Sequence, residues 1–297
     1  MARIAFAGIG NMGWPMAANL IKAGHSVTVA DLSAERVARF VSEVGGQGAS
    51  SPAEAAKDAE VFITILPTSR EVAVVAEAVG GALPRGALFL DMTSGNPSRT
   101  REIAAKLAEH GVRMVDCPVS GGVPRAVSGE LAIMVGGEAA DVDAAEPVLR
   151  GMGTSIHRCG GIGAGQAMKA LNNMVSAGGY ALGVEALLIG QKFGLEPGTM
   201  VDVLNSSSGM NDSSKRKLRQ FVLSRRFDSG FTMELMVKDL SIALEVGKEA
   251  GAPSPVMALT RELWAAAMNH IGGKEDHTAM CKLYETMGNT TLTGGNR

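Results

Sequence analysis

The N-terminal stretch that organises the fold reads Gly8-Ile9-Gly10-Asn11-Met12-Gly13. It follows an apolar run of strand character, Ile4–Ala7, and precedes a helical pattern, Pro15–Ala23. In a GxGxxG motif of this context, the first glycine permits a tight turn. The second lets the backbone approach a pyrophosphate, and the third lets helix and strand pack closely. The motif therefore predicts dinucleotide binding, although a plain glycine turn of an α/β protein would give the same letters.

An acidic residue follows the motif at the position where a dinucleotide fold needs one. Asp31 ends the next β-rich run, Ser26–Ala30. A carboxylate there accepts both ribose hydroxyls of the adenosine and repels a 2′-phosphate, which favours NAD over NADP. Arg36 lies close by in the sequence and softens that preference, so NADP stays possible. Asp31 can also serve as a helix cap.

Short β-rich runs alternate with helical patterns throughout the first half of the chain. The predicted further strands are Ser26–Ala30, Val61–Leu66, Ala87–Asp91, Met114–Asp116 and Leu131–Val135. The predicted further helices cover Ser33–Ser42, start at the capping box Ser51–Glu54, and start at Asn96. Strands that alternate with helices indicate a parallel, doubly wound α/β sheet of the Rossmann type.

The pattern changes near residue 160, where strands give way to helices. Gln166–Gly194 forms one long helical pattern, rich in small residues that would let a second helix approach closely. We therefore expect a Rossmann domain at 1–162 and an all-α domain at 163–297, joined by a long interdomain helix. That helix favours burial in a homodimer or homotetramer.

Composition excludes several classes of protein. The 297 residues carry 28 Lys and Arg against 30 Asp and Glu, which leaves no basic footprint for nucleic acid. The three cysteines are far apart, so we expect neither disulfides nor a metal site, and they fit a reducing compartment. The N-terminus does not resemble a signal peptide, and no run is long and apolar enough to span a membrane. The expectation is a soluble cytoplasmic protein without nucleic-acid or membrane partners.

Two polar residues share one face of the long helix. Lys169 and Asn173 are four positions apart, and the neighbours of Lys169 are mostly apolar. Burial disfavours the charged form of a lysine, so its pKa falls toward the value that a general acid or base needs. Asn173 can donate and accept hydrogen bonds and so orient a hydroxyl or carboxylate. From spacing alone, the pattern favours an exposed lysine on an amphipathic helix over a buried acid/base.

Several sequence blocks together resemble the β-hydroxyacid dehydrogenase family, which includes 3-hydroxyisobutyrate dehydrogenases and tartronate semialdehyde reductases. They occur in family order across nearly the whole chain. The blocks are the GxGxMG of residues 8–13, Asp116–Gly122 with Gly129–Leu131 and Met134–Gly137, the GxGxxxKxxxN of residues 163–173, and Phe231 to Lys238-Asp239-Leu240.

The resemblance implies a role for each matching residue. Lys169 would be the catalytic acid/base of a reversible hydride transfer between a small 3-hydroxy acid and the nicotinamide. The cofactor would be held by Gly8, Gly10, Asn11, Met12, Gly13, Asp31, Leu66, Pro67, Thr93 and Lys238. The substrate would be bound by Ser120, Gly121, Gly122, Asn173 and Lys238. The site would lie in a cleft between the two domains. A loop corner at Ser120–Gly122 and a solvated Lys238 are the structural alternatives.

Two residues depart from the family pattern. Arg125 stands where small residues are more common and could meet a second anion on the substrate, although a surface arginine is the simpler interpretation. Cys117 stands where an alanine is expected, and we assign it no chemistry. The polar stretch Ser206–Asp212 could also reach the substrate. None of these features identifies the substrate.

The competing interpretations differ in class. A 6-phosphogluconate dehydrogenase would carry a histidine where Asn172 stands and would need a longer chain, and imine reductases usually replace the lysine. The best match is a 3-hydroxyisobutyrate dehydrogenase. The alternatives are a tartronate semialdehyde or glyoxylate-type reductase and a dehydrogenase of a hydroxysulfonate or sugar acid. A non-catalytic NAD-binding protein on the same fold is the alternative of another class.

Overall fold

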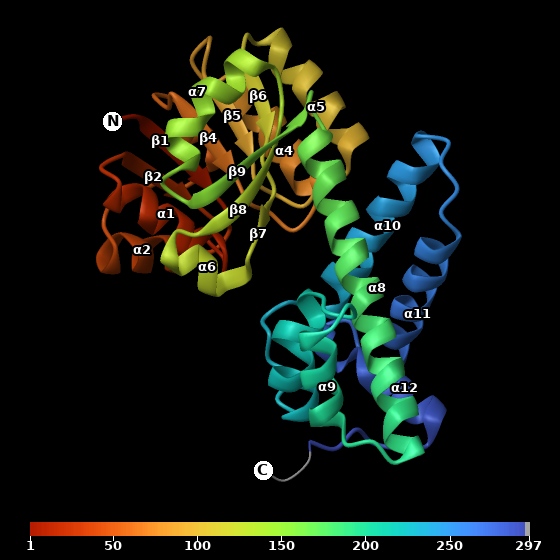
Figure 1. Cartoon of the computed structure of the whole chain (residues 1–297). Coiled ribbons are helices and arrows are strands. Elements are labelled where there is room, and N and C mark those ends of the chain that lie inside the picture. The colour runs from red at the N-terminus through yellow and green to blue at the C-terminus, as the bar shows by residue number, and fades with distance from the viewer. Residues whose placement is uncertain (295–297) are drawn as a thin grey trace. The chain divides into compact units, whose positions relative to one another are not determined.

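The computed structural model describes residues 1–294 and forms two compact units, Met1–Lys169 and a second that begins at Ala170 (Figure 1). The first unit is an α/β structure and the second is all helical, which confirms the predicted fold class. Helix α8, Ala164–Phe193, is continuous across the boundary. The domain limits 1–162 and 163–297 stay a prediction.

The first unit is built on one nine-stranded sheet. Its strands are β1 Arg3–Ala7, β2 Ser26–Ala30, β3 Gln47–Gly48, β4 Val61–Thr64, β5 Leu88–Asp91, β6 Arg113–Asp116, β7 Val119–Ser120, β8 Leu131–Gly136 and β9 Gly153–Gly160. The order is β3-β2-β1-β4-β5-β6-β8-β7, with β9 beside β8. The six strands from β3 to β6 are parallel and reverse their winding between β1 and β4. In such sheets the ligand binds at this switch point, outside the carboxyl ends of the strands.

The alternation of strands and helices predicted a sheet that is parallel throughout. The observed sheet is mixed. Strand β8 runs antiparallel to β6 and β7. Beyond β6 the chain continues through β7 into the short helix α6, Gly122–Ser128, which contains only seven residues. It therefore turns back and pairs antiparallel.

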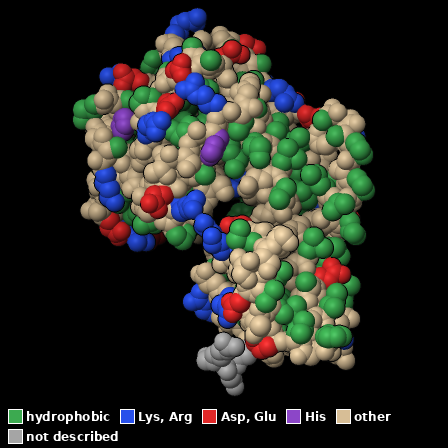
Figure 2. Space-filling model, viewed as in Figure 1, with side chains coloured by type: hydrophobic (Ala, Val, Ile, Leu, Met, Phe, Trp, Pro, Cys, Tyr) green, Lys and Arg blue, Asp and Glu red, His purple; other side chains and the backbone are tan. Residues whose placement is uncertain are grey.

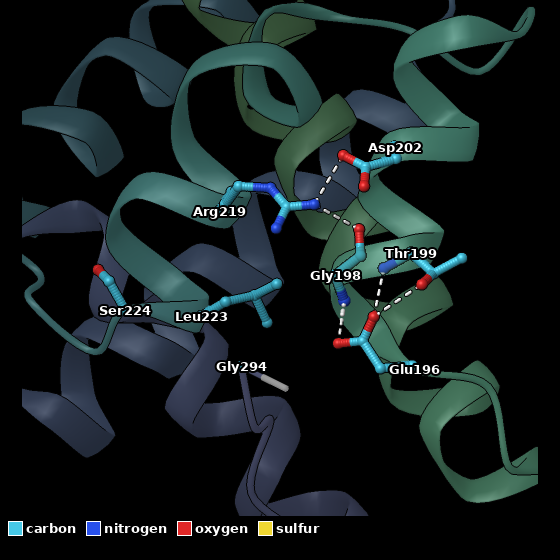
Figure 3. A pocket seen from close by; sticks show the side chains of 8 residues that line it. All are labelled: Glu196, Gly198, Thr199, Asp202, Arg219, Leu223, Ser224 and Gly294. Atoms are coloured by element: carbon cyan, nitrogen blue, oxygen red, sulfur yellow. Dashed lines mark hydrogen bonds and ion pairs between the residues drawn. The ribbon is translucent and has the colours of Figure 1, made fainter. Parts of the chain in front are cut away.

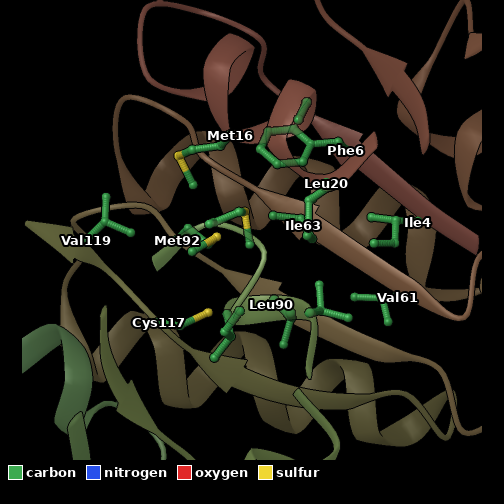
Figure 4. Packing of buried hydrophobic residues seen from close by; sticks show 14 of the residues in the cluster. Ile4, Phe6, Met16, Leu20, Val61, Ile63, Leu90, Met92, Cys117 and Val119 are labelled. Atoms are coloured by element: carbon green, nitrogen blue, oxygen red, sulfur yellow. The ribbon is translucent and has the colours of Figure 1, made fainter. Parts of the chain in front are cut away.

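Helices cover both faces of the sheet. They are α1 Gly13–Lys22, α2 Ala34–Glu43, α3 Pro52–Ala56, α4 Ser69–Gly80, α5 Pro97–Glu109 and α7 Ala139–Leu149, besides α6. Alternate residues of β1 face opposite layers. Ile4 and Phe6 pack with Met16 and Leu20 of α1 (Figure 4), whereas Ala5 belongs to the core on the α3 to α5 side. Both faces are buried, as a doubly wound fold requires.

Sequence patterns located most of these elements but not all. The helix predicted at Ser33–Ser42 is α2, with Ser33 accepting the Arg36 N–H as its cap. Strand β9 was not predicted, because its exposed and half-buried residues lack an apolar pattern. The two-residue strands β3 and β7 are too short to give one.

The second unit consists of helices packed around the greater part of α8. They are α9 Pro197–Ser206, the π-helix η1 Ser214–Leu223, α10 Met233–Glu249, α11 Pro255–Ile271, the 3₁₀-helix η2 His277–Met280 and α12 Cys281–Gly288. Tyr180 of α8 and Trp264 of α11 are fully buried at the centre of this core. Within residues 1–294, none of the helices is long and apolar enough to cross a membrane.

Candidate active site

The three glycines of the turn between β1 and α1 have different structural duties. Gly8 has a φ of +94°, and a Cβ on it would overlap the Ile65 carbonyl oxygen. A Cβ on Gly13 would overlap the Gly8 carbonyl oxygen. A Cβ on Gly10 would meet nothing within 4 Å. The fold itself thus requires Gly8 and Gly13, whereas Gly10 borders open space that a ligand can enter.

Helix α1 begins at this turn without a side chain capping its N-terminus and without an acidic residue in its first turn. The N–H groups at the start of such a helix lack intrahelical partners, and the helix dipole adds a partial positive charge there. A phosphate group satisfies both. The turn and the helix start therefore fit the pyrophosphate of a dinucleotide.

Asp31, at the end of β2, is tied to the glycine turn. Its Oδ2 accepts the Ile9 N–H at 3.0 Å and its Oδ1 accepts the Ser33 N–H at 3.0 Å. Arg36 forms an ion pair with Oδ1 at 3.1 Å. Asp31 therefore holds the turn in shape, and the neighbouring arginine that the sequence flagged is already paired with it.

The carboxyl ends of β4 and β5 bring two other predicted cofactor residues together. The Leu66 N–H donates to Thr93 Oγ1 at 3.0 Å, and the Leu66 side chain reaches within 2.8 Å of where a Gly8 Cβ would stand. Thr93 is fully buried, and its N–H donates to Asp91 at 3.0 Å. Leu66 and Thr93 thus lie at the same edge of the sheet as the glycine turn.

The Ser120–Gly122 loop forms a turn that only glycine adopts easily. Gly121 and Gly122 have φ angles of +133° and +66°. Ser120 ends β7, and α6 begins at Gly122 without a side-chain cap. Arg125 lies against this loop, because a Cβ on Gly121 would stand 2.6 Å from its Cδ. The arginine that departs from the family pattern is therefore next to a predicted substrate-binding residue.

Buried polar groups fix the start of α8. Asp116, at the end of β6, accepts the Gly163 N–H on Oδ1 at 2.6 Å and the Gln166 N–H on Oδ2 at 2.7 Å. The Gln166 side chain accepts the Gly95 N–H at 2.7 Å and donates to Asp91 Oδ2 at 3.3 Å. Burial raises the pKa of Asp116 to about 7 against the opposing effect of its two N–H bonds. These contacts set the position and rotation of the helix that carries Lys169.

Lys169 and Asn173 are both buried on α8, one turn apart. Asn173 Nδ2 donates to Asp239 Oδ2 at 2.6 Å, and Lys238 Nζ lies 3.3 Å from Asp239 Oδ1. The Asp239 side chain is only 2% exposed. The carboxylate therefore joins Lys238 and Asn173, two of the predicted substrate-binding residues. Spacing alone favoured an exposed lysine, and that expectation is wrong, because Lys169 is buried.

Comparison with known proteins shows the family to which the chain belongs. Residues 3–161 match the model of the NAD-binding domain of 6-phosphogluconate dehydrogenase, and residues 163–284 match that of the NAD-binding domain of NADP-dependent 3-hydroxyisobutyrate dehydrogenase. The chain belongs to the β-hydroxyacid dehydrogenase family. It is accordingly an NAD(P)-dependent oxidoreductase that acts on hydroxy acids.

Individual members of the family resemble this β-hydroxyacid dehydrogenase over nearly their full length. It is 39% identical to the 3-hydroxyisobutyrate dehydrogenase of Pseudomonas aeruginosa, over 96% of this chain and 99% of the relative. It is 38% identical to the 2-(hydroxymethyl)glutarate dehydrogenase of Eubacterium barkeri, over 99% and 98%. The solved 3-hydroxyisobutyrate dehydrogenase of Mycobacterium tuberculosis, described with L-serine, superposes with a TM-score of 0.88 at 34% identity, over 96% and 99% of the two chains.

Sequence reasoning missed the residues that support this dehydrogenase's predicted site. Asp91, Asp116 and Gln166 were not assigned any role, although each aspartate directly ends an apolar strand. An acidic residue at that position is the signal that could have found them, because the carboxyl ends of the parallel strands share one edge of the sheet. Asp239 was quoted only as part of a sequence block.

A hollow in the helical unit of the dehydrogenase contains no predicted site residue (Figure 3). Its polar side chains are occupied with the start of α9. Glu196 accepts the N–H groups of Gly198 and Thr199 at 2.8 and 2.6 Å. Arg219 donates to the Gly198 carbonyl and to Asp202, each at 2.6 Å. The hollow thus has a structural explanation.

The cysteines take no part in the predicted chemistry. Cys117 is fully buried, and burial raises the pKa of its thiol well above the usual value. All three thiols are free. Among residues 1–294, no group of His, Cys, Asp or Glu side chains is arranged to hold a metal ion.

Proposed function

We propose that the protein interconverts a small 3-hydroxy acid and its semialdehyde in the manner of a 3-hydroxyisobutyrate dehydrogenase. The observation that carries this proposal is the pair of buried residues Lys169 and Asn173 on one face of α8. A buried lysine beside an amide is suited to exchange a proton with a substrate hydroxyl whose position the amide fixes. When bound, the nicotinamide cofactor supplies hydride acceptance and donation.

The residues divide the work of the proposed reaction. On oxidation, the neutral Lys169 amine accepts the hydroxyl proton, and on reduction its ammonium donates one. Asn173, held by Asp239, orients the hydroxyl. Ser120, with the N–H groups of Gly121 and Gly122, binds the substrate carboxylate. Lys238, paired with Asp239, adds a positive charge to the substrate or cofactor.

We propose NAD as the preferred cofactor. Asp31 lies at the end of β2, where its carboxylate can accept ribose hydroxyls. Its pairing with Arg36 keeps the guanidinium from meeting a 2′-phosphate. The pyrophosphate would contact the backbone at Gly10, Asn11 and Met12, with Gly8 and Gly13 shaping the turn. Leu66, Pro67 and Thr93 would line the remainder of the cofactor site.

Arg125 supports a second candidate substrate. Its side chain lies over Gly121, so it can bind a second anionic group on a molecule whose carboxylate is held by the Ser120–Gly122 loop. A hydroxysulfonate or sugar acid would supply that group. A 35% identical relative is the 3-sulfolactaldehyde reductase of Escherichia coli, over 94% of this chain and 95% of the relative. A tartronate semialdehyde reductase would use the same residues in the reducing direction.

We also propose that the enzyme is a homodimer or homotetramer whose interface includes α8. Val175, Leu182 and Ile189 repeat every seven residues on this helix and are 71%, 67% and 66% exposed. Hydrophobic side chains gather on the visible surface of the helical unit (Figure 2). A second copy would cover them, because a seven-residue apolar spacing suits helix pairing. Light scattering should give a multiple of the chain mass for the native protein and a smaller mass for Leu182→Glu.

The location that we propose is the cytoplasm. The three cysteines are free and two of them are fully buried, as in proteins that never meet an oxidising compartment. Cell fractionation checks this, and recovery in the periplasm or medium would contradict it.

A turnover assay tests the central proposal. Reduction of NAD+ is followed with 3-hydroxyisobutyrate, glycerate, 2-(hydroxymethyl)glutarate and a hydroxysulfonate. Lys169→Ala should lower kcat by about 10²- to 10⁴-fold and leave NADH binding intact. Lys192→Ala, an exposed lysine on the same helix, is the matched control. Full activity of Lys169→Ala would remove the lysine from the mechanism, and NAD binding without any turnover would favour the non-catalytic alternative.

A further inference from the structure

Lys217 is a partly buried cation that neither the mechanism nor the core explains. It lies in η1, a ten-residue π-helix, and its Nζ donates to Ser176 Oγ of α8 at 3.1 Å. One turn earlier, Ser213 Oγ donates to the Ser176 carbonyl at 3.2 Å. Both hydrogen bonds hold the start of η1 against α8 at Ser176. The π-helical geometry is rare and occurs frequently at functional sites.

Among the residues that the structure describes, 1–294, the charge of Lys217 lacks a carboxylate partner, because no Asp or Glu oxygen lies within ion-pair distance of its Nζ. Two acids are close enough to influence it from further away, Asp212 and Asp276. Asp212 is paired with Arg216 at 3.3 Å. Asp276 accepts hydrogen bonds from Ser229 and Thr278, each at 2.9 Å. Both acids are therefore engaged elsewhere.

Electrostatics agree with this geometry. Burial lowers the pKa of Lys217, and the more distant charges of Asp212 and Asp276 only partly oppose that effect. Burial also lowers the pKa of the neighbouring His277 to about 4, so its ring is neutral at physiological pH. Lys217 is thus a single positive charge, partly withdrawn from water, with one neutral hydroxyl as its partner. An anion would restore the stabilisation that water gave it.

The position of Ser176 relates Lys217 to the reacting end of the substrate. Lys169, Asn173 and Ser176 follow one another at intervals of four and three residues, so they share one face of α8. Seven residues of helix span about 10 Å. The contact between Lys217 and Ser176 therefore lies about two helical turns beyond Lys169, on the same face of α8.

We propose that Lys217 is a specificity-determining residue that binds a second carboxylate of the substrate. This inference rests on the proposed function, since it assumes that Lys169 meets the hydroxyl. It deepens that function by naming the substrate class as hydroxylated dicarboxylic acids. Such a substrate would satisfy the charge of Lys217 at the moment of binding.

Steady-state kinetics with two matched substrates test the proposal. Lys217→Met should raise the KM for 2-(hydroxymethyl)glutarate at least tenfold and change the KM for 3-hydroxyisobutyrate by less than twofold, with kcat retained for both. Lys217→Arg should restore most of the affinity for the diacid. Lys215→Met, which removes an exposed lysine from the same helix, should change neither substrate. An equal effect of Lys217→Met on both substrates, or no effect on the diacid, would overturn the proposal.

Two further measurements separate this inference from the proposed function. Calorimetric titration of glutarate into the NAD-loaded protein needs no turnover. Wild-type binding that weakens at least tenfold in Lys217→Met supports the anion site even if none of the hydroxy acids reacts. Absent or equal binding rejects it. The thermal midpoint of the ligand-free Lys217→Met protein should fall by no more than the loss of the single hydrogen bond to Ser176 explains, because the lysine has no ion pair to lose. A marked fall would indicate a structural role instead.

Discussion

The carboxylate of Asp116 accepts the backbone N–H of Gln166 at 2.7 Å, which joins the end of strand β6 to the first turn of helix α8. The Gln166 side chain continues the connection to Asp91 at the end of β5. Lys169 follows Gln166 by three residues and therefore shares its face of the helix. The orientation of the proposed acid/base is thus determined by two aspartates that have no place in the proposed chemistry.

Replacing Asp116 by asparagine should flatten the pH dependence of the first unit's stability. Burial raises the pKa of Asp116 from 3.8 to about 7. Between these values the folded unit keeps a proton that the unfolded chain has released, so stability falls as pH rises. The shift corresponds to about 4 kcal/mol over the whole window. An asparagine side chain does not titrate, and urea unfolding from pH 5 to 8 should show a shallower decline for Asp116→Asn.

Each unit contains a tryptophan, which permits separate measurement. Trp14 lies in α1 and Trp264 in α11. The Trp264→Phe background reports the first unit by fluorescence, and Trp14→Phe reports the second. If the pH profiles with and without Asp116→Asn were parallel in the Trp264→Phe background, Asp116 would not titrate with the raised pKa.

The stability of the second unit should depend on pH in the opposite direction, because of His277. Burial lowers its pKa from 6.5 to about 4. As pH falls through this window the unfolded chain binds a proton that the folded unit excludes, so stability is lost toward acid. The loss is about 3 kcal/mol. His277→Gln should remove this acid loss when unfolding is followed by Trp264 in the Trp14→Phe background. If the stability of His277→Gln fell toward acid pH as steeply as that of the parent protein, other groups would be responsible for the loss.

Gly10 and Gly13 should separate binding from folding. Gly10→Ala introduces a Cβ into open space, so its unfolding midpoint should match wild type, while its affinity for NADH falls at least tenfold because the backbone can no longer approach the pyrophosphate. Gly13→Ala forces a Cβ against the Gly8 carbonyl and should lower stability by several kcal/mol. Fluorescence titration with NADH and urea unfolding give the two readouts. Equal NADH affinity of wild type and Gly10→Ala would place the pyrophosphate elsewhere.

Asp31→Ser should shift cofactor preference toward NADP. The change removes the repulsion of a 2′-phosphate and releases Arg36 from its ion pair. The ratio of kcat/KM for NADP over NAD should rise by at least tenfold. Adding Arg36→Ala should cancel the gain, because the guanidinium would then be missing. A ratio unchanged by Asp31→Ser would show that Asp31 only supports the turn at Ile9.

The sequence predicted the parallel strands β1, β2, β4, β5 and β6 well, because each of them is largely buried and appears as an apolar run. Ser26–Ala30 matches β2 residue for residue, and the long helix predicted at Gln166–Gly194 is α8 with slightly different ends. Strand β9 could not be predicted in this way, because its pairing with β8 is made by backbone hydrogen bonds that leave no side-chain pattern. The antiparallel direction of β8 depends on the path of the chain at α6, which composition does not record.

The site was predictable only where a motif is continuous in the sequence. The glycine turn, Asp31 and the Lys169–Asn173 pair are each defined by short spacings. The contacts of Asp239 with Asn173 and of Lys217 with Ser176 join residues far apart in the chain. Tertiary packing alone determines these contacts, so no local sequence pattern predicts them.

Folding requires two of the three turn glycines and cofactor binding requires the third. This difference predicts which of them changes first in a descendant that no longer binds its cofactor. A descendant that had stopped using its cofactor would still need Gly8 and Gly13, because its backbone could not close without them. Substitution of Gly10 by another small residue would not destabilise the fold, because a Cβ there meets no other atom within 4 Å. A homologue that lacks only the middle glycine would therefore be identified as a protein that keeps this fold but no longer binds the cofactor.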